Sequence, residues 1–500
     1  MNKRSLMRRN TLYIIHFAAA TRILIFLKDI LIASRLGVSY KMDSYILALS
    51  TIMLISKLIG DGIIVALIPL LQEIQRDKGI YKKVEYTNNL INTIILLSIP
   101  LITGGYFAAP YLIRVFGPGF RGGELDKAVL LFRLGLPIVS LSWVRAVCGG
   151  FLQSDHAFRA GAKGGLSYEL VLIIYLLLFA RYFELRGLML AGIAGVIGQI
   201  LIALDAMKDK GYRYEFRLDL KDRYLWKVVA FVFPIILGVG VNELNKSIDN
   251  AIASTLPMGS ITELNYANEI VNLFLGLFIV AIVTVIFPVL SQSHGNKDMT
   301  SLKEEIHHGI KTLLIISIPV SLILMTMSEP IVKIFFERGA FDWQASFFTS
   351  RALVYYALGL PAMALIPLIT RTYYSFQDMK TPVVISMAAL VVNFILNIAL
   401  SPMMGARGIA LATSIAAILA ATMGLKDLNW KLRFSEDDYI RRMSLRLLAA
   451  SITMVIGIIV SYGLIASHSE SIFLYNLVSV GLSSTVGLSL YALVYRLVRL

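Results

Sequence analysis

Fourteen predominantly apolar windows, each long enough to contain a candidate helix, follow one another along this 500-residue chain. A helix needs about 20 predominantly apolar residues to cross the hydrocarbon core of a bilayer. The windows cover 12–34, 43–74, 86–114, 127–152, 167–183, 187–206, 224–255, 261–291, 305–335, 346–375, 381–401, 406–425, 443–466 and 471–497. The chain is 57% hydrophobic and 16% charged, which agrees with this pattern. We therefore predict an all-α polytopic membrane protein with 14 transmembrane helices.

Lysine and arginine residues are distributed unequally between alternate loops. About 27 lie in the N-terminal tail, the even-numbered loops and the C-terminal end, and about 9 lie in the odd-numbered loops. Because positive charge gathers on the cytoplasmic side, both termini are predicted to be cytoplasmic. The same rule accounts for the net charge of +15, so no nucleic-acid partner is expected. The first apolar window carries Arg22 and Lys28 and is expected to be retained as a helix rather than cleaved as a signal peptide.

Short strings recur in order at offsets of 219 to 224 residues. Leu134–Pro137 returns unchanged as Leu358–Pro361, and Asp29–Ser34 is echoed by Asp249–Ser254. The other matches are Pro69 with Pro288, Gln153 with Gln377, and Arg186 with Arg407. We interpret residues 1–210 and 211–430 as two homologous six-helix lobes, with residues 431–500 as two additional helices. Parallel repeats of this kind are typical of rocking secondary transporters.

Charged residues lie inside the apolar windows. The bases are Arg22, Lys28, Lys57, Arg145 and Arg371, and the acids are Asp29, Asp61, Glu169, Glu243, Asp249 and Glu269. A charge at bilayer depth costs several kcal/mol unless it faces water or a partner. One interpretation is a polar cavity whose bases bind an anionic substrate, because guanidinium and ammonium groups suit phosphate oxygens. The other is mutual neutralisation, for which Lys57 with Asp61, and Lys28 with Asp29, are suitably spaced.

One set of polar residues has the composition of a cation site. It consists of Asp249, Asn393, Asn397 and Thr413. One carboxylate with amide and hydroxyl oxygens is hard-ligand chemistry for an alkali cation, so a sodium ion is the candidate cofactor. The alternative is that Asn and Thr form ordinary hydrogen bonds between membrane helices. The residues alone leave both interpretations open.

Motifs for enzymatic or nucleotide-driven chemistry do not occur in the sequence. It contains neither G-x-x-x-x-G-K-[ST] nor H-E-x-x-H, and its single cysteine, Cys148, excludes an internal disulfide framework. A membrane enzyme acting on a lipid would need an acidic metal or nucleotide site at the surface, which the loops lack. We therefore expect a transporter, not an enzyme, driven by an ion gradient, the membrane potential or consumption of its substrate.

Several strings together resemble the MurJ (MviN) lipid II flippases of the multidrug/oligosaccharidyl-lipid/polysaccharide exporter superfamily. They are Thr21-Arg22, Lys28-Asp29, Asp43, Phe336–Phe341 (FERGAF), Phe376–Pro382 (FQDMKTP) and Gly408–Thr413 (GIALAT). The resemblance runs from the first helix through the twelfth. It implies two six-helix lobes around a cationic cavity, with the last two helices forming a groove for a lipid tail.

The resemblance also implies a function and a set of site residues. The expected substrate is the undecaprenyl-diphosphate-linked peptidoglycan precursor, lipid II, moved from the cytoplasmic to the outer leaflet of a bacterial cell membrane by alternating access. Cell-wall synthesis proteins are the partners expected in that setting. The candidate substrate-binding residues are Arg22, Lys28, Asp29, Asp43, Lys57, Arg145, Glu269 and Arg371. The sodium site carries over at Asp249, Asn393 and Thr413, with Asn397 where some members have aspartate.

Two departures from the family pattern bear on the substrate. Ser56-Lys57 stands where an arginine pair is usual, and Tyr266-Ala-Asn-Glu269 has an acid where an arginine is usual. These exchanges leave two alternatives open. One is a flippase for another polyprenyl-diphosphate-linked glycan, and the other is a cation-coupled small-molecule exporter of the same superfamily.

Overall fold

The computed structural model describes residues 3–295, 298–432, 437–466 and 473–497, and within these ranges all regular secondary structure is helical. Ten of the described helices are long and apolar enough to cross a membrane. One of them, α2 (Tyr40–Phe116), has 77 residues, and Gly79 interrupts it at φ 81° and ψ 176°. At 1.5 Å per residue α2 would be about 115 Å long, so it holds two predicted spans, 43–74 and 86–114. The prediction of an all-α polytopic membrane protein is confirmed.

Three other predicted windows are interrupted by the backbone. The window 224–255 forms α6 (Arg223–Val239) and α7 (Val241–Ala253). The window 261–291 forms α8 (Ser260–Phe274), the π-helix η1 (Leu275–Ile279) and α9 (Val280–Gly295). The window 305–335 forms α10 (Met299–Thr326) and α11 (Ser328–Phe336). A hydropathy window averages side-chain polarity, so it does not detect such breaks.

The remaining helices overlap the predicted windows but differ from them at several ends. They are α1 (Lys3–Leu36), α3 (Gly123–Ser154), α4 (Arg159–Leu178), α5 (Ala180–Lys208), α12 (Trp343–Ser375), α13 (Lys380–Met404), α14 (Ala406–Leu432), α15 (Asp437–Ala466) and α16 (Phe473–Leu497). Helix α1 begins at residue 3 and not 12, α5 at 180 and not 187, and α15 at 437 and not 443. The predicted start of the last window, residue 471, lies outside the described residues. Helix α4 begins eight residues before the predicted 167, because its first turns are basic and glycine-rich and therefore fall outside an apolar window. The predicted break between 183 and 187 is confirmed at Glu184, which has φ 44° inside α5.

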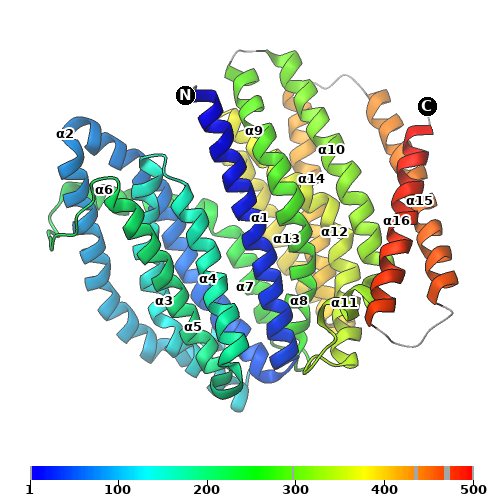
Figure 1. The fold of residues 1–500 in the computed structure, drawn as a ribbon, viewed down its shortest axis with the longest axis horizontal. Coiled ribbons are helices and arrows are strands. Elements are labelled where there is room, and N and C mark those ends of the chain that lie inside the picture. The colour runs from blue at the N-terminus through cyan, green and yellow to red at the C-terminus, as the bar shows by residue number, and fades with distance from the viewer. Residues whose placement is uncertain (1–2, 296–297, 433–436, 467–472, 498–500) are drawn as a thin grey trace. The chain divides into compact units, whose positions relative to one another are not determined.

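The chain divides into two compact units, residues 1–262 and 263–500. In the first unit α2 packs along α3, α4 packs against α5 and α1, and α6 and α7 contact α2 (Figure 1). In the second unit α14 contacts α12 and α13, and α15 pairs with α16. The last two helices approach closely at Gly487 of α16, where any side chain would collide with Ile458 of α15. The lobe boundaries predicted from the repeats, at 210 and 430, stay a prediction.

The same turn occurs once in each unit. It joins α3 to α4 and α12 to α13, at positions 221 residues apart. His156 and Gln377 both adopt left-handed backbone, with φ 58° and 59°. The next amide donates back to the helix, from Ala157 to the Leu152 oxygen at 2.8 Å and from Asp378 to the Tyr373 oxygen at 3.0 Å. These are the long-range bonds of a Schellman-type helix end. The offset of 221 residues lies within the range of the sequence matches, 219 to 224, and supports a duplication, although it pairs Gln377 with His156 and not with Gln153.

Candidate functional site

Lys28 on α1 lies between two carboxylates of the first unit. Its Nζ is 3.2 Å from Glu169 Oε2 on α4 and 3.6 Å from Asp29 Oδ1. All three side chains are largely buried, with 16%, 8% and 10% of their surface exposed. The expected proximity of Lys28 and Asp29 is therefore present, and Glu169 was outside the predicted substrate-binding set. One base faces two acids here, so an anionic ligand would have to compete with Glu169 for Lys28.

Lys57 on α2 forms an ion pair with α7. Its Nζ is 2.6 Å from Glu243 Oε1, and about half of the lysine side chain, 48%, is exposed. Further along α7, Asn250 donates to Ser50 Oγ on α2 at 3.0 Å. The ion pair with Glu243 replaces the Lys57–Asp61 pair that spacing on one helix had suggested. A half-exposed lysine remains accessible to a second anion.

Asp43 binds the segment 259–262, at the end of the first unit. Its Oδ2 accepts from the Gly259 amide at 2.6 Å, and its Oδ1 accepts from the Thr262 amide at 2.8 Å and the Thr262 hydroxyl at 2.5 Å. The side chain is buried, and the first amides of a helix need such an acceptor. In this structure both oxygens of Asp43 accept hydrogen bonds from residues 259 and 262 of the same unit. Its predicted role in substrate binding stays a prediction.

The predicted substrate-binding residues are divided between the two units. Arg22, Lys28, Asp29, Asp43, Lys57 and Arg145 belong to the first unit, and Glu269 and Arg371 belong to the second. Arg22 on α1 and Glu269 on α8 are partly buried, whereas Arg371 on α12 is exposed. A single cavity that collects all eight stays a prediction. Arg145 lines a cavity of its own within the first unit, together with Gln153 and Gln199, which were outside the predicted set.

The second unit brings together three of the four predicted sodium ligands. Asn393 on α13 donates to Thr413 Oγ1 on α14 at 3.3 Å, and Asn397 donates to Asn393 Oδ1 at 2.8 Å. Both asparagines are fully buried. Asp249, the only carboxylate of the predicted set, is buried in α7 of the first unit. Amide, hydroxyl and carboxylate oxygens fit a small alkali cation in chemical type. Sodium binding stays a prediction.

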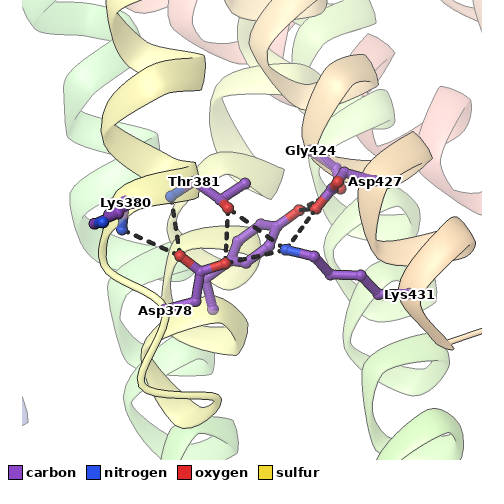
Figure 2. Close-up of polar contacts among 7 residues, drawn as sticks. Asp378, Lys380, Thr381, Gly424, Asp427 and Lys431 are labelled. Atoms are coloured by element: carbon purple, nitrogen blue, oxygen red, sulfur yellow. Dashed lines mark hydrogen bonds and ion pairs between the residues drawn. The ribbon is translucent and has the colours of Figure 1, made fainter.

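The turn between α12 and α13 starts a polar cluster at the end of the second unit's core (Figure 2). Asp378 accepts from the amides of Lys380 and Thr381 at 3.1 and 3.0 Å, and from the Thr381 hydroxyl at 2.7 Å. The bonds from Thr381 hold the pKa of Asp378 well below its usual range. The string Phe376–Pro382, which carried part of the family resemblance, therefore has a structural role, because it starts α13.

Lys431 on α14 connects this turn to the neighbouring helices. Its Nζ lies 3.0 Å from a carboxylate oxygen of Asp378 and 3.0 Å from one of Asp427. The ammonium also lies 4.8 Å from the centre of the Tyr373 ring, and the Tyr373 hydroxyl donates to Asp427 Oδ2 at 2.6 Å. The cluster links α12, α13 and α14. Those are the helices that carry Arg371, the two buried asparagines and Thr413.

The fold and the charges within its spans define a polytopic membrane transport protein. A solved structure described as "Lipid II flippase MurJ, inward closed conformation" superposes with a TM-score of 0.81 at 26% identity, covering 96% of this chain and 98% of the other. The family model described as "Lipid II flippase MurJ" matches residues 32–480. The chain belongs to the MurJ lipid II flippase family.

Curated relatives agree with this assignment. A probable lipid II flippase MurJ of Buchnera aphidicola subsp. Baizongia pistaciae is 27% identical over 460 residues, covering 91% of this chain and 90% of the relative. A probable lipid II flippase MurJ of Rickettsia prowazekii is 28% identical over 406 residues, covering 79% and 78%. An inward-facing multidrug resistance MATE transporter has a TM-score of 0.69 at 13% identity, covering 83% and 94%, and shows a shared fold alone.

Proposed function

We propose that this protein is a flippase that moves lipid II from the cytoplasmic to the outer leaflet of a bacterial membrane. The observation that carries the proposal is the family match over residues 32–480. The intramembrane bases Arg22, Lys28 and Lys57 suit the diphosphate of such a lipid, because phosphate oxygens accept charge-assisted hydrogen bonds. The substrate in this proposal is an anion carried on a lipid tail.

Binding of the diphosphate would couple to movement through the ion pairs of the first unit. Lys57 holds α7 through Glu243, and Lys28 holds α4 through Glu169. A phosphate that takes either lysine releases a carboxylate on another helix. A ligand shifts a conformational equilibrium only through such differential contacts. The lipid therefore favours a state in which these helix pairs are less tightly held, and its release restores the original pairs.

Two further elements of the proposal concern the membrane. Both termini are cytoplasmic, supported by the excess of basic residues in the tail and the even-numbered loops. The polyprenyl tail follows α15 and α16, which expose large apolar side chains such as Leu448, Ile459, Leu474 and Leu482. In a bilayer these side chains contact lipid, which suits a path for a long hydrocarbon chain.

Sodium coupling is proposed on the donor chemistry of Asp249, Asn393, Asn397 and Thr413. Sodium, compared with choline at equal ionic strength, should raise the melting temperature of the purified protein, because a ligand that binds the folded state stabilises it. Asp249→Ala should remove that increment. An equal sodium effect in wild type and in Asp249→Ala would leave the asparagines as hydrogen-bonding contacts between helices.

The function is tested by complementation of a bacterium depleted of its own lipid II flippase. Expression of this chain should restore growth and normal cell shape, and Arg22→Ala at equal membrane abundance should not. Failure of the abundant wild-type chain would contradict the assignment to lipid II.

The departure at Asn268-Glu269 favours one second candidate, a flippase for another polyprenyl-diphosphate-linked glycan. That candidate predicts failed complementation together with transport of a different lipid-linked diphosphate in vesicles. It also predicts that Glu269→Arg, which restores the usual family charge, shifts transport towards lipid II.

A further inference from the structure

A cavity lies inside the first unit among α2, α3, α4 and α5. Its volume is about 120 Å³, and its polar lining consists of Arg145, Gln153 and Gln199. Glycines provide the space: a side chain on Gly161 would meet no atom within 4 Å, and one on Gly149 would first meet Ile64 at 4.0 Å. A single water needs roughly 10–15 Å³ of space open to its centre, so the cavity has room for a group of several heavy atoms.

The charge on Arg145 is not compensated by an ion pair within the described part of the chain. No carboxylate there lies within 4.0 Å of its guanidinium, and none lines the cavity. Asp61 acts on Arg145 electrostatically from beyond that distance, whereas Lys28 and Lys57 each contact a carboxylate directly. An arginine within a membrane span is retained where it faces water or a counter-charge. The cavity is where Arg145 meets that condition.

The two glutamines supply further donors around the same space. Among the described residues, neither the Gln153 nor the Gln199 amide makes a side-chain hydrogen bond. Arginine offers five N–H donors and each glutamine offers two, and no acid lines the space with them. A planar guanidinium flanked by neutral amides is suited to carboxylate or phosphate oxygens, and it disfavours cations.

We propose that the Arg145 cavity is a binding site for an oxyanion, either a phosphate or a carboxylate group. The guanidinium of Arg145 binds two of its oxygens, and Gln153 and Gln199 donate to the remainder. The oxyanion belongs either to a soluble molecule or to the head group of an anionic lipid. The site lies wholly within residues 1–262, so it holds whether or not the protein moves lipid II.

The test compares inorganic phosphate with chloride at equal ionic strength, using the full chain purified in an uncharged detergent. Thermal unfolding is followed as phosphate is increased. Arg145→Gln removes the charge, and Gly161→Leu fills the space while it keeps Arg145. Lys208→Gln is the matched control, because Lys208 is an exposed base on α5, the helix that carries Gln199, and lies outside the cavity. A second arm places the same four proteins in phosphatidylcholine nanodiscs with or without phosphatidylglycerol.

Stabilisation by phosphate in wild type and Lys208→Gln, with binding at least about tenfold weaker in Arg145→Gln and Gly161→Leu, supports a site for a soluble oxyanion. The same variant pattern with phosphatidylglycerol alone supports a lipid head group. Gly161→Leu keeps the test decisive if Arg145→Gln fails to fold. Equal stabilisation in all four proteins, or none in either arm, overturns the proposal.

Discussion

The turn after α3 and the turn after α12 share a backbone conformation. An aspartate of each turn pairs with a lysine from another helix, Asp155 with Lys83 of α2 and Asp378 with Lys431 of α14, and the two lysines differ in their surroundings. In the first unit the side chain of Lys83 is 0% exposed. Its Nζ lies 2.8 Å from Asp155 Oδ1, 2.9 Å from Gln75 Oε1 and 4.4 Å from the centre of the Phe151 ring. In the second unit Lys431 is 31% exposed and lies between two carboxylates, Asp378 and Asp427.

The difference arises from what covers the first turn. Residues 209–222, between α5 and α6, form a covering segment that is bound by three asparagines of α2. Asn88 donates to the Arg213 oxygen at 2.9 Å, and Asn92 donates to the Arg217 oxygen at 2.8 Å. Asn89 exchanges two bonds with the Asp219 backbone, at 2.9 and 2.6 Å.

A tyrosine of the same segment completes the cover. Tyr212 packs edge-on against Phe151 at 5.6 Å and donates to Asn88 Oδ1 at 2.6 Å. The phenol of Tyr212 is a donor at neutral pH, and burial raises its pKa further. The two copies of this turn therefore differ in the burial of their ion pairs. A covering segment buries the first ion pair, whereas the second stays open to water and weaker.

Asp155→Ala should have the largest effect of the three variants that probe this difference. It leaves the buried ammonium of Lys83 without its carboxylate, at a cost of about 3 kcal/mol in the free energy of unfolding. Thermal or denaturant unfolding of the purified protein measures this cost. Lys83→Met combined with Asp155→Ala should recover much of the loss, because no buried charge remains. A loss in Asp155→Ala no greater than that in Asp378→Ala would contradict the difference between the two turns.

Asn89→Ala should have an intermediate effect, because it leaves two backbone groups of Asp219 without their partner. The expected loss is about 2 kcal/mol, and it is local to the covering segment. Trypsin should cleave after Arg217 or Lys221 faster in this variant than in wild type. The matched control is Thr87→Ala, because the Thr87 hydroxyl donates to the Lys83 backbone oxygen within α2 and does not contact the covering segment in a described hydrogen bond. Equal cleavage rates in the two variants would show that the asparagines do not hold the segment.

Asp378→Asn should have the smallest effect, about 1 kcal/mol at pH 7, the usual value of a helix cap. Because the folded-state pKa of Asp378 is lowered, its contribution is present above the unfolded pKa of about 3.9 and is lost as the pH falls towards the folded value. The difference in melting temperature between wild type and Asp378→Asn should be constant from pH 7 to 5 and shrink below about pH 4. A difference in melting temperature that grows as the pH falls would contradict a lowered pKa of Asp378 in the folded state.

Most of the fold could be predicted from the sequence because apolar windows and loop charges record a membrane topology directly. The breaks inside α6–α7, α8–α9 and α10–α11 could not, because backbone irregularity leaves little trace in average hydropathy. Glu184 was found because charged residues on both sides of it mark the end of an apolar span.

Parts of the site were less accessible to sequence reasoning. Charges inside the spans selected Lys28, Lys57 and Arg145 as candidates, but spacing along one helix suggested Asp61 as the partner of Lys57. The observed partner, Glu243, is 186 residues away, and such contacts depend on packing. Gln153 appeared among the repeat matches, and Gln199 had no signal. The polar residues within Thr87–Asn92, in an otherwise apolar stretch, are the sequence feature that could have indicated that α2 binds the covering segment.

The most direct measurement of the central proposal is translocation of a lipid-linked diphosphate in vesicles that contain the purified protein. Arg22→Ala should transport at least about tenfold more slowly than wild type, because a charge-assisted, two-pronged contact to phosphate is removed. Arg22→Lys should recover little of this rate, and Lys28→Arg, which keeps the charge, should retain it. Transport by Arg22→Ala at the wild-type rate would contradict the assignment of the intramembrane bases to the substrate.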